Sequence, residues 1–268
     1  MAHSQRKPRG HATVTVFGRR AVEEAFEACK SERVSIERVR IANDLPASYH
    51  KQIQQLCRDQ HGKQKIEYEV VPRVDVHAVT NEPRHDQGIA ALVHLFNVVD
   101  LDDYLDRLKG RGARDPARVL ALDAITNPQN IGLVIRSAVA FGAGTILWPT
   151  KGVPWIEGLV IKASASTLYQ ATIIPCEYLA DGLTELASSG FRLAGLDSHA
   201  SVDLDVFESS HRQVFVLGSE TQGISEEVDP LLDDVVRIPM MAGVESLNVA
   251  VSAAVVCYAM SVRTNDSG

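Results

Sequence analysis

Three stretches of the sequence place a few polar side chains next to glycines, which is a pattern typical of ligand-binding loops. In the first, Arg136 lies among apolar residues and follows Gly132, which is small enough to leave room beside the guanidinium. In the second, Glu220 lies between glycines that let the backbone approach a ligand closely. The third, residues 238–248, ends in Asn248. A guanidinium, a carboxylate and an amide of this kind can orient an anionic or polar ligand.

The second half of the chain contains the elements that would position these stretches. Short β-rich runs alternate there with helical patterns such as residues 178–189. The runs are Val119–Leu122, Thr145–Trp148, Ala171–Ile174, Phe191–Leu196, Gln213–Leu217 and Val235–Ile238. Repeated strand-then-helix units with apolar strands predict an α/β fold with a parallel sheet covered on both faces. Ligands of such sheets bind beyond the carboxyl ends of the strands, so the loops that follow strands should carry the site.

The stretch around Arg136 predicts a helix with defined ends. Asn127 before Pro128 is typical of a helix start, because the side chain can cap the helix and proline fits its first position. Gly142 is expected to end the helix. The stripe predicted to be buried comprises Ile131, Val134, Ile135, Ala138 and Val139, and Gly132 and Arg136 share the opposite face.

The third stretch leads into a helix with almost no charge. Gly243 should let the preceding loop turn, and Ser246 is expected to cap the helix. From Leu247 to Met260 the only polar residues are Asn248 and Ser252, which are four apart and therefore share one stripe. A helix that is apolar on nearly all sides must be covered on nearly all sides, so we expect it to pack in its own domain and against a second subunit. It is too short for a comfortable membrane span.

The glycines at 142–144 do not form a dinucleotide-binding fingerprint. That motif needs a strand before the glycines and a helix after them, whereas here a helix precedes and a strand follows. A nicotinamide-dependent dehydrogenase is therefore disfavoured. The four cysteines are scattered without metal-binding spacing, so neither a zinc site nor a disulfide framework is indicated.

The first third of the chain predicts a separate small domain. Residues 1–12 are polar and basic and are expected to be disordered, residues 13–98 alternate short strands and helices, and residues 99–117 form a connector with the domain boundary near Gly110. Residues 118–268 then form the larger domain. The N-terminus has no apolar core of the kind found in secretory signals, so a cytoplasmic location is expected.

Charge is distributed unevenly along the chain. The net charge is −7, yet residues 1–100 hold 15 Lys and Arg against 13 Asp and Glu. A nucleic-acid partner should therefore be bound mainly by the first domain. Candidate contacts are Tyr49, Arg58, Lys63 and the arginines near the N-terminus.

Taken in order, the three stretches resemble the signature of the SpoU, or TrmH-like, branch of the SPOUT RNA methyltransferases. The matching residues are Asn127, Pro128, Asn130, Gly132 and Arg136, then Leu217, Gly218, Glu220 and Gly223, then Ile238, Pro239, Met240, Gly243, Ser246, Leu247, Asn248 and Val249. Residues 14–97 resemble the ribosomal-protein-like RNA-binding domain that precedes the catalytic domain in several bacterial members, through VFGRRAVEEAF and RHDQGIAALV. The similarity is strongest to the type that methylates a guanosine 2′-hydroxyl in 23S rRNA.

The resemblance implies a fold, a cofactor and a set of site residues. It implies a deep trefoil knot, S-adenosylmethionine bound in the knot, and a homodimer across which the active site is completed. The implied catalytic residues are Asn130, Arg136, Glu220, Ser246 and Asn248, and the implied cofactor-binding residues are Leu196, Gly218, Ile238, Met240 and Leu247. No metal and no membrane partner are implied.

The resemblance also implies transfer of a methyl group to a ribose 2′-hydroxyl, in which Arg136 has been proposed as the general base. Guanidinium groups almost never lose their proton in proteins. We therefore expect Arg136 to clamp the adjacent phosphate and to stabilise charge developing on the 2′-oxygen. Asn130 and Asn248 would orient the ribose, Ser246 would support the loop, and Glu220 would hold a donor in place.

Two alternative functions stay open at this point. The substrate could be tRNA instead of 23S rRNA, although the extra front domain favours rRNA by analogy. The protein could also be a non-catalytic RNA-binding factor in ribosome assembly, which the presence of all five implied catalytic residues disfavours. A role in antibiotic resistance also stays open, because some members of the family protect ribosomes in this way.

Overall fold

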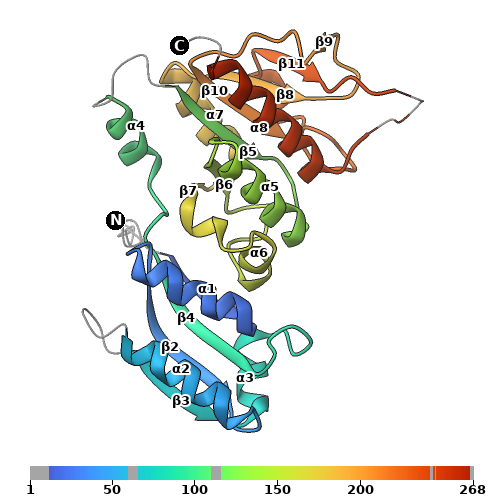
Figure 1. Cartoon of the computed structure of the whole chain (residues 1–268). Coiled ribbons are helices and arrows are strands. Elements are labelled where there is room, and N and C mark those ends of the chain that lie inside the picture. Colours follow the sequence, from blue (N-terminus) through green and yellow to red (C-terminus); the bar gives the residue numbers. More distant parts are fainter. Residues whose placement is uncertain (1–11, 60–65, 110–115, 242–243, 245, 266–268) are drawn as a thin grey trace, which may run out of the picture. The chain divides into compact units, whose positions relative to one another are not determined.

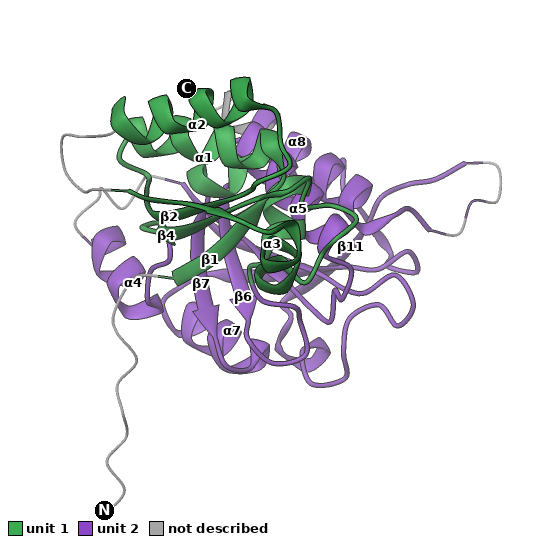
Figure 2. Ribbon diagram, turned by 90° about the horizontal axis from the view of Figure 1, so that it is seen from below, with its two compact units in different colours: residues 1–97, 156–170 green, residues 98–155, 171–268 purple. Residues whose placement is uncertain are grey.

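A computed structural model describes residues 12–59, 66–109, 116–241, 244 and 246–265, and side chains are described up to Val262 (Figure 1). The chain divides into two compact units (Figure 2). Unit 1 comprises Met1–Asn97 and Ile156–Gln170, and unit 2 comprises Val98–Trp155 and Ala171–Gly268. The expected disordered segment and the expected boundary at Gly110 lie outside the described residues, except that Ala12 already belongs to the first strand.

Unit 1 is built on a four-stranded mixed sheet. Its strands are β1 (Ala12–Phe17), β2 (Val34–Ala42), β3 (Glu67–Val71) and β4 (Ile89–Leu95), in the order β1-β4-β2-β3. β4 pairs antiparallel with β1 and β2, and β2 pairs parallel with β3. Alternate side chains of β2 are buried, as expected for a strand with one face on a core. The mixed α/β organisation predicted for this part of the chain is confirmed.

Three helices accompany this sheet. α1 (Arg19–Lys30) lies between β1 and β2 in the chain and buries Val22 and Phe26 on its apolar stripe, and α2 (Ala47–Asp59) lies between β2 and β3. α3 (Arg73–Thr80) lies between β3 and β4. Val74 and Val76 alternate with polar residues, a pattern that does not favour a helix. The helix ends at Asn81, which adopts the left-handed conformation (φ 55°).

Residues 156–170 interrupt unit 2 in sequence but pack within unit 1. They form α6 (Gly158–Ala163) and a 3₁₀ turn, η1 (Thr167–Gln170). A side chain at Gly158 would collide with the ring of Phe17. Ser166 donates a hydrogen bond to the Glu24 carboxylate, and the Asn97 amide donates to the carbonyl of Leu168 at 2.6 Å. Packing therefore places this segment with the residues of the first domain.

Unit 2 contains a seven-stranded sheet in which all paired neighbours are parallel. The strand order is β7-β6-β5-β10-β8-β11-β9. The strands are β5 (Ala117–Leu122), β6 (Thr145–Pro149), β7 (Thr172–Cys176), β8 (Arg192–Leu196), β9 (Val202–Asp203), β10 (Arg212–Leu217) and β11 (Asp234–Arg237). All six predicted strands are present, and the two-residue β9 is the addition. The predicted parallel α/β fold is confirmed.

Both faces of this sheet are covered. One buried cluster joins Val119 and Ala121 of β5 to α4 (Leu101–Lys109) and α7 (Leu179–Ser188). Leu120 and Leu122 are also fully buried and, by strand alternation, face the opposite side. There α5 (Pro128–Ala140) packs against α8 (Val249–Asn265), and the two helices lie side by side in Figure 1. A short 3₁₀ turn, η2 (Asp229–Leu231), precedes β11.

Within the described residues, no helix is both long enough and apolar enough to cross a membrane.

Candidate active site

The loop after β5 forms the helix start that the sequence predicts. The side chain of Asn127 accepts a hydrogen bond from the backbone N–H of Gln129 at 2.9 Å, and Pro128 occupies the first turn. At the other end, Gly142 adopts a φ of 75° and the N–H of Ala143 bonds the carbonyl of Ala138 at 2.8 Å. Ile131, Val134, Ile135 and Ala138 are buried as predicted, and Val139 is half-buried. These contacts fix where α5 begins and ends.

Gly132 and Arg136 differ in their surroundings although they share a face of α5. Gly132 is buried and Arg136 is exposed.

The loop after β10 folds back on itself. Ser219 and Gly223 exchange backbone hydrogen bonds of 3.0 and 2.9 Å, and the hydroxyl of Ser219 accepts from the N–H of Gln222 at 3.1 Å. A side chain at Gly218 would collide with the backbone of Gly223, so only glycine fits there. Gly223 has a φ of 69°, which also favours glycine. The result is a closed turn that carries Glu220 at its tip.

The third stretch enters α8 differently from the prediction. The helix begins at Val249, and the side chain of Asn248 accepts from the N–H of Ala250 at 3.0 Å. The predicted cap at Ser246 is therefore wrong, because Asn248 takes this role from a position two residues later. The expected stripe is present, since the N–H of Ser252 bonds the carbonyl of Asn248 at 3.0 Å. Gly243 lies outside the described residues.

The three loops meet at the Glu220 carboxylate. Its Oε1 atom accepts from the Asn130 amide at 3.1 Å, from the Asn248 amide and from the N–H of Val249 at 3.3 Å. The Asn248 amide also donates to the side-chain oxygen Oδ1 of Asn130 at 3.2 Å. A carboxylate beside the first N–H groups of α8 is favourably placed with respect to the helix dipole. We call Asn130, Glu220 and Asn248 the amide–carboxylate cluster.

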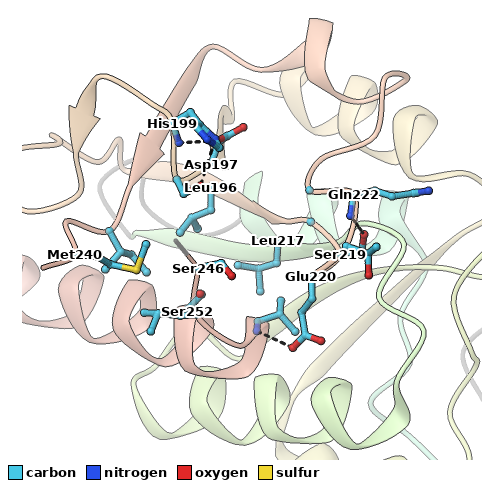
Figure 3. A pocket seen from close by; sticks show the side chains of 17 residues that line it. Leu196, Asp197, His199, Leu217, Ser219, Glu220, Gln222, Met240, Ser246 and Ser252 are labelled. Carbon is cyan, nitrogen blue, oxygen red and sulfur yellow. Dashed lines mark hydrogen bonds and ion pairs between the residues drawn. The ribbon is translucent and has the colours of Figure 1, made fainter. Parts of the chain in front are cut away.

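A cavity of about 470 Å³ opens beside this cluster, at the carboxyl ends of β8, β10 and β11. Figure 3 shows the side chains around it. All five residues expected to bind a cofactor line the cavity, namely Leu196, Gly218, Ile238, Met240 and Leu247, and so do Glu220 and Ser246. Apolar side chains and closely approached backbone are thus combined with a few polar groups, as in sites for small organic ligands.

Sequence reasoning missed part of this lining. Asp197 and His199 line the cavity directly after β8, and Asp197 accepts from the backbone N–H of His199 at 2.7 Å (Figure 3). Ser252 of α8 also lines it. The rule that ligands bind beyond the carboxyl ends of parallel strands could have found Asp197, since it immediately follows the predicted strand 191–196.

Arg136 is separate from these groups within the described part of the chain. It is exposed, it does not line the cavity, and the hydrogen bonds and ion pairs found there do not include it. Asn130 lies on the same helix but is buried and bonded to Glu220. The structure therefore brings Asn130, Glu220 and Asn248 together, and of these only Glu220 lines the cavity, as Ser246 also does. Arg136 lies apart from both the cluster and the cavity.

Cysteine thiols and metal-binding clusters are two other kinds of group that could carry chemistry. Burial raises the pKa of the Cys257 thiol to about 12 and that of Cys57 to about 11, so these thiols are poor nucleophiles at neutral pH. The described residues also contain no group of three or more His, Cys, Asp and Glu side chains that could hold a metal ion.

One candidate RNA contact in unit 1 is placed differently from the expectation. Tyr49 is 8% exposed, and the guanidinium of Arg19 lies 4.8 Å from the centre of its ring. The ring is therefore not free to stack on a base, and this expectation was wrong. Arg58 is exposed as expected, whereas Lys63 lies outside the described residues.

A parallel α/β domain with a ligand-sized cavity beyond its strand ends defines a class of domains that bind nucleotide-like cofactors or substrates. Comparison with known families narrows this class. Residues 117–258 match the model of the SpoU rRNA Methylase family, and residues 15–99 match the model described as RNA 2′-O ribose methyltransferase substrate binding. The chain belongs to the SpoU rRNA methylase family, and it is an RNA methyltransferase.

Relatives agree with this assignment over most of the chain. A putative TrmH family tRNA/rRNA methyltransferase of Staphylococcus aureus (strain MSSA476) is 29% identical over 253 residues, which cover 94% of this chain and 97% of the relative. An uncharacterized tRNA/rRNA methyltransferase of Mycobacterium avium (strain 104) is 35% identical over 191 residues, covering 71% of this chain and 60% of the relative.

Solved structures share the fold. The SpoU methyltransferase AviRb from Streptomyces viridochromogenes, in complex with the cofactor AdoMet, superposes with a TM-score of 0.72 at 22% identity, covering 96% of this chain and 91% of AviRb. A putative RNA methyltransferase of the TrmH family from Porphyromonas gingivalis gives a TM-score of 0.68 at 22% identity, covering 94% and 90% of the two chains.

Proposed function

We propose that this protein transfers the methyl group of S-adenosylmethionine to a ribose 2′-hydroxyl of 23S rRNA. The observation that carries the proposal is a cavity at the carboxyl ends of β8, β10 and β11, with Glu220 in its wall bonded to Asn130 and Asn248. The match of residues 15–99 to a 2′-O ribose methyltransferase substrate-binding model supports the choice of the ribose hydroxyl.

The residues around the cavity suit S-adenosylmethionine. Leu196, Ile238 and Leu247 offer apolar contacts of the kind that an adenine ring needs, and the backbone around Gly218, which also lines the cavity, offers hydrogen-bonding groups. Asp197 and Ser252 add polar groups for the hydroxyl and amino-acid parts of the cofactor. A bound sulfonium supplies an already activated methyl group, so the chain itself must align the acceptor oxygen and assist loss of its proton.

The amide–carboxylate cluster would provide that alignment. Glu220 fixes the amides of Asn130 and Asn248 by accepting from both, so each amide keeps a defined orientation toward the substrate. Ser246 lines the cavity next to them and supports the loop. Orienting groups that are already in place lowers the entropic cost of bringing the 2′-oxygen into line.

Arg136 would act from a second copy of the chain. Its exposure and its separation from the cavity of its own chain support this assignment. As a protonated guanidinium it would clamp the neighbouring phosphate and stabilise the developing negative charge on the 2′-oxygen.

A second subunit also fits the surface of α8. Val251, Tyr258 and Val262 are 49%, 57% and 40% exposed at spacings that place them on one face of the helix, and Leu133 of α5 is 42% exposed. We propose that this apolar face is the homodimer interface. A trefoil knot in unit 2 is part of the same proposal, because β10 lies between the earlier strands β5 and β8 and α8 returns to pack on α5.

Unit 1 would select the RNA. We propose that residues 13–98 bind rRNA and that residues 118–268 carry out the transfer, joined by the 99–117 connector. Arg20, Arg58 and Arg84 are exposed there and can contact phosphates. Substrate tRNA is the competing possibility, since relatives carry names that include both RNAs.

Mapping of ribose methylation tests this function. Ribosomal and transfer RNA from cells with and without the gene would be compared nucleotide by nucleotide. We expect one 2′-O-methyl group to disappear from 23S rRNA in the deletion strain. Loss from tRNA alone would show that the substrate is tRNA and not 23S rRNA. Unchanged methylation of both RNAs would contradict ribose methylation by this protein and favour a non-catalytic assembly factor.

A further inference from the structure

Asp123 is a buried carboxylate at the base of the site that the proposed chemistry does not use. It directly follows β5 and is 5% exposed. Its backbone N–H bonds the carbonyl of Leu217 at 2.9 Å, which extends the pairing of β5 with β10 by one residue. Its Oδ2 atom accepts from the backbone N–H of Ser225 at 2.7 Å. The carboxylate therefore joins the end of β5 to the far end of the loop that carries Glu220.

Apart from the bonds of Glu220, the hydrogen bonds of this loop are local, so its direction depends on how its ends are held. The turn at 219–223 is closed by bonds within itself, which fix its shape but not its direction. One end continues from β10 through Gly218. At the other end, Ile224 occupies space left by the missing side chain of Gly195, and Ser225 is held by Asp123. A hydrogen bond to an ionised carboxylate is stronger than one between neutral groups.

The same two segments are tied a second time at the top of the loop. Asp123 is followed by Ala124, whose φ of 53° turns the chain toward α5, where Asn130 bonds Glu220 at 3.1 Å. Residues 123–130 and 217–225 are thus linked at the base by Asp123 to Ser225 and at the top by Asn130 to Glu220. Loss of the lower link would let the loop tilt and would take Glu220 away from both amides.

We propose that Asp123 is a positioning residue for methyl transfer, which acts by fixing residues 217–225 so that Glu220 holds Asn130 and Asn248. This inference rests on the function proposed above. Asp123 itself does not line the cavity in the described part of the chain, so it acts through residues 217–225 and not by touching cofactor or RNA. Its effect on the transfer rate passes through Glu220, and its effect on cofactor affinity passes through the cavity wall at 217–223.

A double-mutant cycle on the full-length protein tests this role. The variants are Asp123→Ala, Glu220→Gln and the combination, with single-turnover methyl transfer to unmethylated RNA from the deletion strain as readout. Asp123→Ala should slow transfer at least about tenfold in the wild-type background and less than about twofold in the Glu220→Gln background, since its effect passes through Glu220. Asp123→Asn keeps an acceptor oxygen and should lose less than Asp123→Ala.

Asp233 provides a control for the hydrogen bond alone, because its carboxylate accepts from the backbone N–H of Leu193 at 2.8 Å. This bond lies at the opposite ends of the strands, and Asp233 is exposed. Asp233→Ala should leave the transfer rate within about twofold of wild type even where the melting temperature falls. The proposal is overturned if the losses of Asp123→Ala and Glu220→Gln multiply independently, if Asp123→Ala is as fast as wild type, or if Asp233→Ala is equally slow.

Failure of the proposed function would give a different pattern, because wild-type protein would then transfer no methyl group. Calorimetric titration with S-adenosylmethionine then takes over as the readout, since residues 218–223 line the cavity. Asp123→Ala should weaken this binding and Asp233→Ala should not. Equal affinities for the two variants would overturn the positioning role.

Discussion

The Asn130 amide donates a hydrogen bond of 3.1 Å to the Glu220 carboxylate across 90 positions of sequence. The same oxygen accepts from the Asn248 amide, so one carboxylate organises two amides, one in α5 and one at the cap of α8. If both amides orient the substrate, Glu220 controls the geometry of the site although its charge does not enter the reaction. The effects expected for substitutions at these residues follow from this relationship.

Glu220→Gln should lower the rate of methyl transfer while leaving most of the affinity for S-adenosylmethionine. The neutral amide cannot accept as strongly from two other amides, and loss of hydrogen bonds to a charged group costs about 1.5–3 kcal/mol, or roughly ten- to a hundredfold in rate. Glu226→Gln is the matched control, because Glu226 is exposed and does not line the cavity. A Glu220→Gln enzyme with normal turnover would contradict the role of the cluster.

Arg136→Lys tests whether the guanidinium acts as a clamp. Lysine keeps the positive charge but loses the planar fork that binds a phosphate through two N–H groups. We expect turnover to fall by about tenfold or more with unchanged affinity for S-adenosylmethionine, since Arg136 does not line the cavity of its own chain. Steady-state kinetics together with calorimetry would separate the two effects. Near-normal turnover would show that charge alone suffices.

Gly218→Ala should abolish cofactor binding. The added methyl group would collide with the backbone of Gly223 and force the loop out of the cavity wall. Gly190→Ala is the matched control, because Gly190 has a φ of 85° and open space around it. It should lower the free energy of unfolding by about 1 kcal/mol and leave binding intact. Equal binding by wild-type and Gly218→Ala proteins would place the cofactor elsewhere.

Val251→Asp should convert the protein to monomers if the exposed face of α8 is the dimer interface. A carboxylate buried between two subunits without a partner is strongly unfavourable. Val206 is 71% exposed and follows β9, the edge strand of the sheet in unit 2, so Val206→Asp is the control. Light scattering coupled to size exclusion would measure the mass of each variant. A dimeric Val251→Asp protein would require a different interface.

Glu185 makes stability depend on pH in a defined direction. Burial raises its pKa, and the neighbouring Asp102 carboxylate raises it further by repulsion and by hydrogen bonding to the protonated form. The folded state therefore holds the proton more tightly than the unfolded state, so stability is greatest below the ordinary pKa of Glu185 and is lost as pH rises through the raised value. Glu185→Gln should remove this loss.

Melting temperatures of wild type and Glu185→Gln should accordingly agree near pH 4 and diverge in favour of the variant toward pH 7. Glu226→Gln, at an exposed position, serves as the control for general charge effects. A difference that is constant across this range would show that the Asp102 contact is not responsible.

The predictable parts of the fold are those with local signals. The six apolar runs of unit 2 became strands, and the central ones, β5 and β10, are buried on both faces. Asn127 with Pro128 fixed the start of α5. The cap of α8 was misplaced because Ser246 and Asn248 are both good capping residues and only packing decides between them.

Features that depend on backbone donors or on tertiary packing were harder to predict. Asp123 binds the N–H of Ser225, a donor that every residue except proline possesses, so the sequence around Ser225 gives no indication of it. The separation of Arg136 from the cavity likewise depends on how α5 packs against α8, and periodicity alone does not report it. Residues 156–170 join unit 1 through contacts with Phe17 and Glu24 that no motif marks.

The most direct measurement uses S-adenosylmethionine with a trideuterated methyl group, unmethylated 23S rRNA and the purified protein. Mass spectrometry of the digested RNA should find one nucleoside with the deuterated methyl on its ribose 2′-oxygen, formed by wild type and strongly reduced with Glu220→Gln. A deuterated methyl on a base, or none on any RNA offered, would contradict the account.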